Sequence, residues 1–365
     1  MINSFIRKFL LSFLLLLFFF SCVRTIQPPI RQSAPILVVE GLITTDSTPY
    51  TIKLSYTGKF TNASLSVDSN QNFINDAIVF IKDDIGDSTI CNLISPGTYQ
   101  SADDGFIGIT GRSYTLIIHL SNGKTYTSTS EKINPVPPID SITVSYDSSF
   151  ITDVRPTQLI ISANTRDPSS QTNYYRWSAS GYLPRKSWGG PCSPSNPPCT
   201  NAFNCVCNAY CELSFNDNQI NILSDQLVNG NEIRQPVNYS PLYCQGSHYI
   251  EIKQYSLNED SYIFWEQYLA QTNRTGSILD PLPASLIGNI YNTSDSSDIA
   301  VGYFEASAVF NKKVIITPLF LQVYYLLSVA SEYVPMGDCH LVFPNSLEDD
   351  AVPSGWENAE IIEMH

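Results

Sequence analysis

The chain has 365 residues, enough for two domains, and its formal net charge is −14. Because so acidic a protein repels phosphate backbones, we expect no nucleic-acid partner. Only 15% of the residues are charged, whereas 21 are tyrosine and 18 are phenylalanine, which is typical of β-rich extracellular folds and argues against a helical bundle.

The first 22 residues carry the pattern of a bacterial lipoprotein leader. Arg7 and Lys8 precede the charge-free segment 9–20, and Ser21-Cys22 follows it. This apolar segment is shorter than the roughly 20 residues of a membrane span and fits a secretory signal. We therefore predict a lipoprotein signal peptide at 1–21 and acylation of the Cys22 thiol, for example by palmitate, which would hold the protein on the outer membrane. The alternative is an ordinary signal peptide or a short anchor helix, with Cys22 uninvolved.

A proline-containing tether is predicted at 22–35, and strand patterns begin directly after it. Apolar or alternating segments occur at 36–43, 50–56, 77–81, 114–120 and 124–128. Asn122-Gly123 is typical of a two-residue hairpin turn between the last two. Short strands separated by turn residues predict an antiparallel β-sandwich, Ig-like or prealbumin-like, over 36–133.

The rest of the chain predicts a second β-rich domain with one or two helices over 141–345, after a stiff proline-rich linker at 134–140 and before a tail at 346–365. Trp177 is expected to be a core aromatic on a strand. The segment 256–272 predicts a helix, with Ser256 or Asn258 as its cap and an aromatic face. The uncharged segment 314–330 is expected to be a buried strand or helix, and not a membrane span.

The cysteines are concentrated in a segment that breaks the strand rhythm. We expect residues 181–247 to be a disulfide-rich insertion and a possible binding surface. Without Cys22 eight cysteines remain, and their pairing stays open, as do a thiolate metal site and free thiols. The disulfide candidates are Cys91, Cys192, Cys199, Cys205, Cys207, Cys211, Cys244 and Cys339.

Patterns of catalysis are missing from the sequence, which has no G-x-S-x-G, H-E-x-x-H or phosphate-loop motif. His119 lies in an apolar strand pattern and is expected to be structural. The pairs Asp83-Asp84 and Asp103-Asp104 have the hard oxygens that Ca²⁺ prefers, but acidic turns are usually just solvated. We therefore expect no catalytic residues, no metal site and no cofactor.

Several motifs resemble one family, the Bacteroidetes lipoproteins with domain of unknown function 4249. The motifs are Leu37–Thr44, Gln254–Leu257, Trp265, Gly276–Pro283, Gly288–Ile290, Val301–Ala306 and Asp338-Cys339. The resemblance implies a lipoprotein signal, β-rich domains and an accessory role beside TonB-dependent β-barrel transporters, and it carries over no catalytic residue.

Two further expectations come from this resemblance. Surface lipoproteins of that phylum tend to have acidic residues after the lipidated cysteine, and Val23–Gln27 departs from this pattern. The side of the outer membrane on which the protein lies, cell surface or periplasmic face, is therefore undecided. Asp140-Ser141-Ile142 resembles an O-glycosylation site of the phylum, which makes Ser141 the candidate acceptor.

Three functions remain as hypotheses. The first is a non-enzymatic outer-membrane lipoprotein that is accessory to a TonB-dependent transporter or to envelope assembly. The second is a surface module that binds glycans or peptides, or adheres, through Tyr182, Trp188 and Tyr210 of the cysteine-rich insertion. The third is a hydrolase with an unrecognised site.

Overall fold

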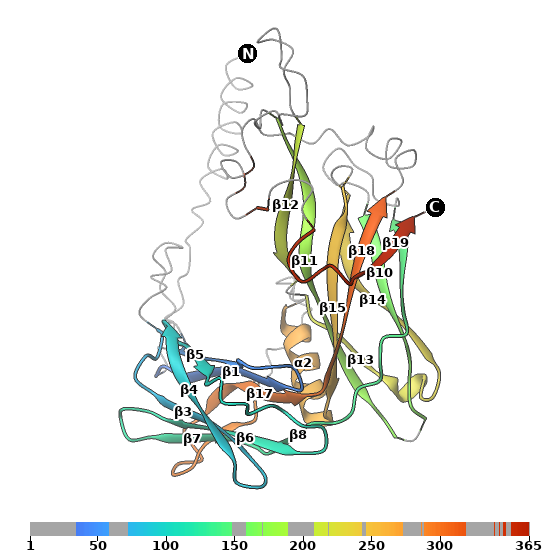
Figure 1. Cartoon of the computed structure of the whole chain (residues 1–365). Helices are drawn as coiled ribbons and strands as arrows, with labels where there is room; N and C mark the ends of the chain where they lie inside the picture. The colour runs from blue at the N-terminus through green and yellow to red at the C-terminus, as the bar shows by residue number, and fades with distance from the viewer. Residues whose placement is uncertain are drawn as a thin grey trace, which may run out of the picture. The chain divides into compact units, whose positions relative to one another are not determined.

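The computed structural model shows a mainly β protein with several sheets and, among the described residues, one α-helix (Figure 1). This confirms the predicted fold class at that level. The structure describes residues 34–57, 72–147, 158–169, 171–188, 208–217, 219–242, 246–272, 286, 288–318, 339, 343, 346–347 and 352–364, without the side chains of 186–188, 208–210, 318 and 364. The predicted signal peptide, Cys22 and most of the predicted tether lie outside these residues.

Ten strands form the first sheet, in the order β16-β7-β6-β3-β4-β5-β2-β1-β17, with β8 also paired to β6. They are β1 (Leu37–Thr44), β2 (Thr51–Tyr56), β3 (Ile78–Asp83), β4 (Ser88–Ser95), β5 (Thr98–Ser101), β6 (Ser113–His119), β7 (Thr125–Ser128), β8 (Glu131–Lys132), β16 (Ile290–Asn292) and β17 (Ala300–Ser307). Alternate residues of β1 and β6 are buried, because successive side chains of a strand point to opposite faces. Val39, Ile52, Leu116 and Phe304 form the centre of this core and have no exposed surface.

The first sheet is completed by strands from far along the chain. β17 runs parallel to β1, β16 pairs with β7, and a bridge between Tyr291 and Ile299 joins the two ends of the strand order. This differs from the predicted domain boundaries, which assigned 290–307 to the second domain. Alternation identifies a strand but not its partner, so this long-range pairing could not be predicted from the strand pattern.

Two further sheets follow. The second sheet has the order β14-β10-β9, and the third has the order β12-β11-β15-β18-β19, with β13 also paired to β11. Their elements are β9 (Ser141–Asp147), β10 (Gln158–Arg166), β11 (Tyr174–Trp188), β12 (Asn208–Asn216), β13 (Asn221–Ser224), the 3₁₀-helix η1 (Asp225–Leu227), β14 (Glu232–Pro241), β15 (His248–Leu257), α2 (Glu259–Thr272), β18 (Val309–Pro318) and β19 (Glu360–Met364). Trp177 is 1% exposed in a core shared by both sheets, as predicted. Its Nε1 donates to Gln254 Oε1 at 2.8 Å.

The helix prediction is confirmed by α2, and its cap is Asn258, whose Oδ1 accepts from the Ser261 amide at 2.7 Å. Segment 314–330 begins inside β18, and its remainder lies outside the described residues. No helix in the described part of the chain has the length and apolarity needed to cross a membrane.

Two segments, 181–247 and 134–140, differ from what we expected of them, because each is joined to a sheet. Within 181–247 the described residues are mainly strands, since β11 continues to Trp188 and pairs with β12. The predicted linker is hydrogen bonded to β15, because Ser256 Oγ donates to the Asn134 carbonyl at 2.6 Å and Gln254 Nε2 donates to the Pro137 carbonyl at 2.9 Å. Val136 packs against both hydrophobic cores. The segment 134–140 is therefore a packed part of the fold.

Candidate functional site

Helix α2 contributes to a buried cluster that we call the arginine clamp, made of Arg176 (β11), Tyr255 (β15), Trp265 (α2) and Glu305 (β17). Arg176 Nη2 lies 2.7 Å from Glu305 Oε1, and the guanidinium carbon is 4.3 Å from the centre of the Tyr255 ring and 5.2 Å from that of Trp265. Trp265 Nε1 donates to the second Glu305 oxygen at 2.7 Å. The clamp thus joins the first sheet, the third sheet and the helix through charge and aromatic contacts.

Burial makes this ion pair important for the fold. The Glu305 side chain is 4% exposed and that of Arg176 is 15% exposed. Burial by itself lowers the pKa of Arg176, but the charge and hydrogen bond of Glu305 outweigh it, so that the pKa is raised. Arg176 therefore stays a cation at any physiological pH. The Arg176 guanidinium contacts the Glu305 carboxylate and the faces of the Tyr255 and Trp265 rings. These contacts position α2 and β17 relative to β11.

A second buried carboxylate, Glu131, lies at the centre of a set of neutral donors. It accepts from Thr129 Oγ1 at 2.6 Å, from Asn289 Nδ2 at 2.9 Å and from the Tyr303 hydroxyl at 3.2 Å, and also from Asn258 Nδ2. Burial, followed by the charge of Glu131, raises the pKa of Tyr303 far above its usual range. The phenol therefore remains a hydrogen-bond donor and does not act as a base.

A polar cavity of about 200 Å³ lies beside this network. It is lined by Asn134 and Pro135, by residues 171–175 and by residues 256–259. Pockets for drug-sized ligands usually measure about 300–1,000 Å³, so this cavity suits water or a small polar group. Its lining supplies amides, hydroxyls and the Glu259 carboxylate, and these groups can hydrogen bond a small ligand.

The residues of these clusters lie within the part of the chain that matches a known protein family. A family model described as Domain of unknown function (DUF4249) matches residues 23–313. The chain belongs to the DUF4249 family. No curated protein matches it. Within this DUF4249 chain, Gln254, Trp265, Asn289 and Glu305 all take part in the contacts described above or in the core beside them.

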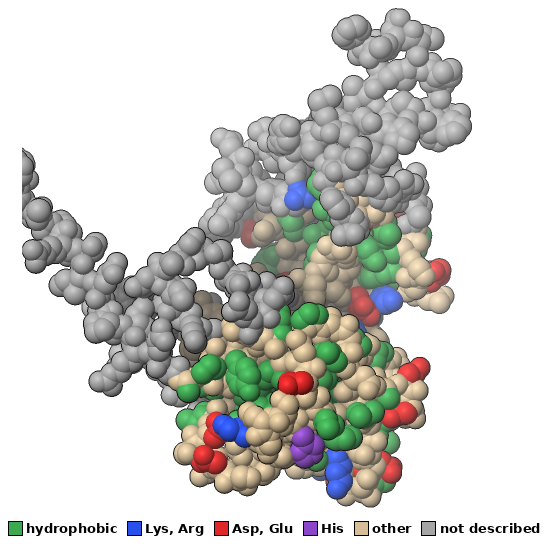
Figure 2. All heavy atoms as spheres, turned by 90° about the vertical axis from the view of Figure 1, so that its left-hand side faces the viewer, with side chains coloured by type: hydrophobic (Ala, Val, Ile, Leu, Met, Phe, Trp, Pro, Cys, Tyr) green, Lys and Arg blue, Asp and Glu red, His purple; other side chains and the backbone are tan. Residues whose placement is uncertain are grey.

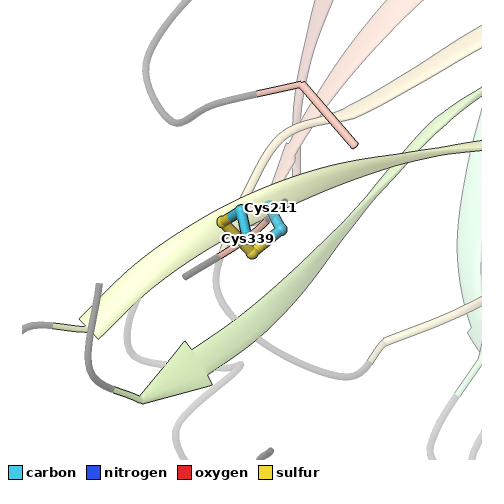
Figure 3. The surroundings of a disulfide bond; sticks show 2 residues. All are labelled: Cys211 and Cys339. Atoms are coloured by element: carbon cyan, nitrogen blue, oxygen red, sulfur yellow. A yellow bond between two sulfur atoms is a disulfide. The ribbon is translucent and has the colours of Figure 1, made fainter. Parts of the chain in front are cut away.

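One disulfide of the DUF4249 chain joins Cys211 of β12 to Cys339, with a sequence separation of 128 (Figure 3). Cys91, which we expected in a disulfide, is instead a buried free thiol in the core of the first sheet. Burial, with a smaller effect of Asp104, raises its pKa to about 12, so the thiol stays protonated and unreactive. The candidates Cys192, Cys199, Cys205, Cys207 and Cys244 lie outside the described residues.

The acidic turns considered for calcium are occupied by protein groups. Arg112 Nη2 lies 2.6 Å from Asp83 Oδ2, and its Nε lies 2.8 Å from Asp84 Oδ1. The hydrogen bond from Arg112 is the main reason why the pKa of Asp84 is lowered. Asp103 and Asp104 accept from the hydroxyls of Thr48 and Thr89 at 3.0 and 2.8 Å. Both carboxylates of the first pair therefore already share one cation of the protein, Arg112.

The remaining predicted site residues lie apart from the clamp. Tyr182 is half-buried on β11 between Ser214 of β12 and Tyr249 of β15. Trp188 and Tyr210 lie on the paired strands β11 and β12, where Tyr210 is opposite Lys186, and their side chains are not described. Ser141 is exposed at the start of β9, and its Oγ accepts from Asn164 Nδ2 at 3.0 Å.

Burial of His248 predicts that the protein loses stability in mild acid. The residue has no exposed surface, its Nδ1 lies 2.8 Å from Ser240 Oγ, and desolvation lowers its pKa from 6.5 to about 4. The unfolded chain takes up a proton near its own pKa, whereas the folded ring stays neutral down to about pH 4. Stability is therefore fully present above pH 6.5 and falls as the pH drops toward 4. We expect a loss of about 1 kcal/mol between about pH 7.5 and about pH 5.5, measured by urea denaturation.

A matched pair of histidine variants tests this assignment. His248→Gln should flatten the pH dependence, whereas His119→Gln, at the exposed histidine of β6, should leave it unchanged. Equal slopes in the wild type and in both variants would contradict the prediction.

Proposed function

We propose that this DUF4249 protein is a non-enzymatic lipoprotein, held on the outer membrane through acylated Cys22, that docks onto a TonB-dependent β-barrel transporter as an accessory subunit. The leader pattern at 1–22 supports the anchor. The resemblance of the sequence to lipoproteins encoded beside such transporters supports the choice of partner.

The observation that carries this proposal is an apolar outer face on the first sheet, which we call the β3–β4 face. It consists of Ile78 and Phe80 of β3, Ile90 of β4, and Ile117 and His119 of β6. Phe80 is opposite both Ile90 and Ile117, and Ile78 is opposite His119. Ile78 is 52% exposed and Ile90 is 42% exposed. Figure 2 shows hydrophobic side chains and a histidine on this part of the surface.

Such a face fits a partner protein that has an exposed apolar surface of its own. Contiguous exposed apolar residues mark protein interaction sites, because exposing them to water costs free energy that contact recovers. The edge-to-face contact of Phe80 with His119, whose ring centres are 6.3 Å apart, holds the aromatic ring in place on the surface. A lipid-anchored protein already lies at the membrane, so a membrane-embedded barrel is a partner within its reach.

Co-purification tests the proposal directly. The full chain would be extracted with mild detergent and isolated by a tag, and associated barrels identified by mass spectrometry. We expect a TonB-dependent barrel with the wild type and with Ile361→Lys, an equally apolar exposed position on β19, and its loss with Ile78→Lys/Ile90→Lys. Recovery without any barrel under several detergent conditions would contradict the proposal.

Cys22→Ser should also move the protein from the membrane fraction to the soluble fraction.

We also propose that the first sheet folds as a β-sandwich. The adjacency of β16 and β17 at the two ends of the strand order supports a sandwich-like arrangement of the Ig-like or prealbumin-like kind.

A second candidate function is a glycan- or peptide-binding surface at the β11–β12 hairpin. The pairing of these two strands brings the segments of Trp188 and Tyr210 side by side, with Tyr182 further along β11. Loss of glycan or peptide binding in Trp188→Ala/Tyr210→Ala would support this function, and unchanged binding would remove it.

A further inference from the structure

The loop after β10 and the loop around η1 together form a cage of oxygen atoms. Asn173 Nδ2 has four oxygens around it, namely Gln171 O at 3.1 Å, Asp225 Oδ2 at 3.2 Å, Asp167 Oδ1 at 3.3 Å and Pro168 O at 3.4 Å. An amide nitrogen has two hydrogens and cannot satisfy four acceptors. At least two of the four oxygens around Asn173 Nδ2 therefore receive no hydrogen from it.

Both carboxylates of the cage are buried, and no cation of the described residues neutralises them. Asp167 is 3% exposed and Asp225 has no exposed surface. Asp167 accepts from the Tyr175 hydroxyl at 2.5 Å and from the Gly230 amide at 2.9 Å, both neutral donors. The ion pairs found among the described residues include neither carboxylate. Two neighbouring buried carboxylates without a counter-charge repel each other and are costly to desolvate.

One oxygen of this pair has no partner. Asp225 Oδ1 is buried and makes no hydrogen bond within the part of the chain that the structure describes. An orphaned carboxylate oxygen beside a second carboxylate indicates a missing positive charge at this point, either a metal ion or a shared proton.

We infer that the two loops bind a calcium ion between Asp167 and Asp225. Carboxylate and carbonyl oxygens are the ligands that Ca²⁺ prefers, and it accepts the irregular arrangements that backbone carbonyls provide. The Asp167 and Asp225 carboxylates and the carbonyls of Pro168 and Gln171 would supply the oxygens. Because Asn173 Nδ2 now lies among these oxygens, its side chain would turn aside when the ion binds.

The chemistry of the cage distinguishes calcium from other metals. The cage has no sulfur or imidazole ligand, which softer metals prefer. Within the described residues no three His, Cys, Asp or Glu side chains form a metal-binding group, so this site depends on two carboxylates supplemented by neutral oxygens. Mg²⁺ demands a near-octahedral shell and keeps several waters, so it should bind more weakly than Ca²⁺.

Calcium titration of the full chain in detergent, after removal of metals with a chelator, tests the inference. The thermal unfolding midpoint of the wild type should rise with added Ca²⁺ and much less with Mg²⁺. In Asp225→Asn the apparent calcium affinity should fall by more than about 100-fold, since losing an outer-sphere partner alone costs 10–100-fold. Asp87→Asn, at an exposed aspartate of the first sheet, should keep the wild-type response.

A direct measurement separates the metal from the shared proton. Tb³⁺, a calcium analogue, should show tyrosine-sensitised luminescence in the wild type because the Tyr175 hydroxyl contacts Asp167. Ca²⁺ should displace this signal, and Asn173→Asp, which adds a carboxylate, should strengthen it. A wild type without any calcium response, together with an Asp225→Asn variant more stable than the wild type in chelator, would show a shared proton and overturn the inference. An unchanged calcium response in Asp225→Asn would overturn it as well.

Discussion

Replacing Gly302 with alanine is expected to destabilise the protein by at least about 3 kcal/mol. Gly302 lies on β17 with φ +100°, where an L-residue is strained, and a Cβ there would lie 1.8 Å from the Val39 carbonyl oxygen of β1. That oxygen belongs to the backbone of a paired strand, so it cannot move without opening the parallel β1–β17 pairing. Urea denaturation at pH 7 measures the loss as a lower midpoint with an unchanged slope.

A second glycine isolates the contribution of the clash. Gly123 in the β6–β7 turn also has a positive φ of +86°, but no atom lies within 4 Å of the position that its Cβ would take. Gly123→Ala should therefore cost only the backbone strain, about 1 kcal/mol. Equal losses in the two variants would show that the close approach of β1 to β17 is unimportant.

The other large effect is expected at the arginine clamp. Glu305→Met keeps a similar side-chain length but leaves the buried Arg176 guanidinium without its carboxylate, and it removes an acceptor from Trp265. Removing one partner of a buried ion pair typically costs about 3–5 kcal/mol. The free energy of unfolding from urea denaturation should fall by that amount.

The double variant Arg176→Met/Glu305→Met should recover much of the loss, because no unpaired buried charge remains. The matched control is the exposed pair of Lys53 and Glu40, whose side chains are 56% and 71% exposed. Glu40→Met should cost less than about 1 kcal/mol. If Glu305→Met were as mild as Glu40→Met, the clamp would contribute little to stability.

Local elements of this fold could be predicted from the sequence, because they depend on nearby residues. The alternation in 50–56 and 114–120 identifies β2 and β6, and the Asn258 cap with acidic residues after it identifies the start of α2. Strand partners could not be predicted in this way. The pairing of β17 with β1 depends on contacts between residues far apart in the sequence, for which periodicity carries no information.

The charged residues of the clamp and of the cage were missed for a related reason. A charged residue in an alternating strand is usually solvent-facing, so the charges of Arg176 and Glu305 by themselves pointed to exposure. A weak signal did exist, since Arg176 stands between aromatic residues and Glu305 follows Tyr303-Phe304 in an otherwise uncharged strand. Asp167 and Asp225 are single acidic residues in separate loops, and only the folded chain brings them together.

The late position of β16 and β17 in the sequence has a consequence for the order of folding. The N-terminal strands emerge first during synthesis, but the outer edge of β1 has no partner until residue 307 is available. An unpaired strand edge is a template for pairing with other chains. The first sheet therefore stays incomplete during synthesis until strands β9 to β15, which belong to the other two sheets, have been made. A chaperone that covers the β1 edge during this interval would suppress misassembly, and a fragment ending at residue 133 should aggregate in place of folding.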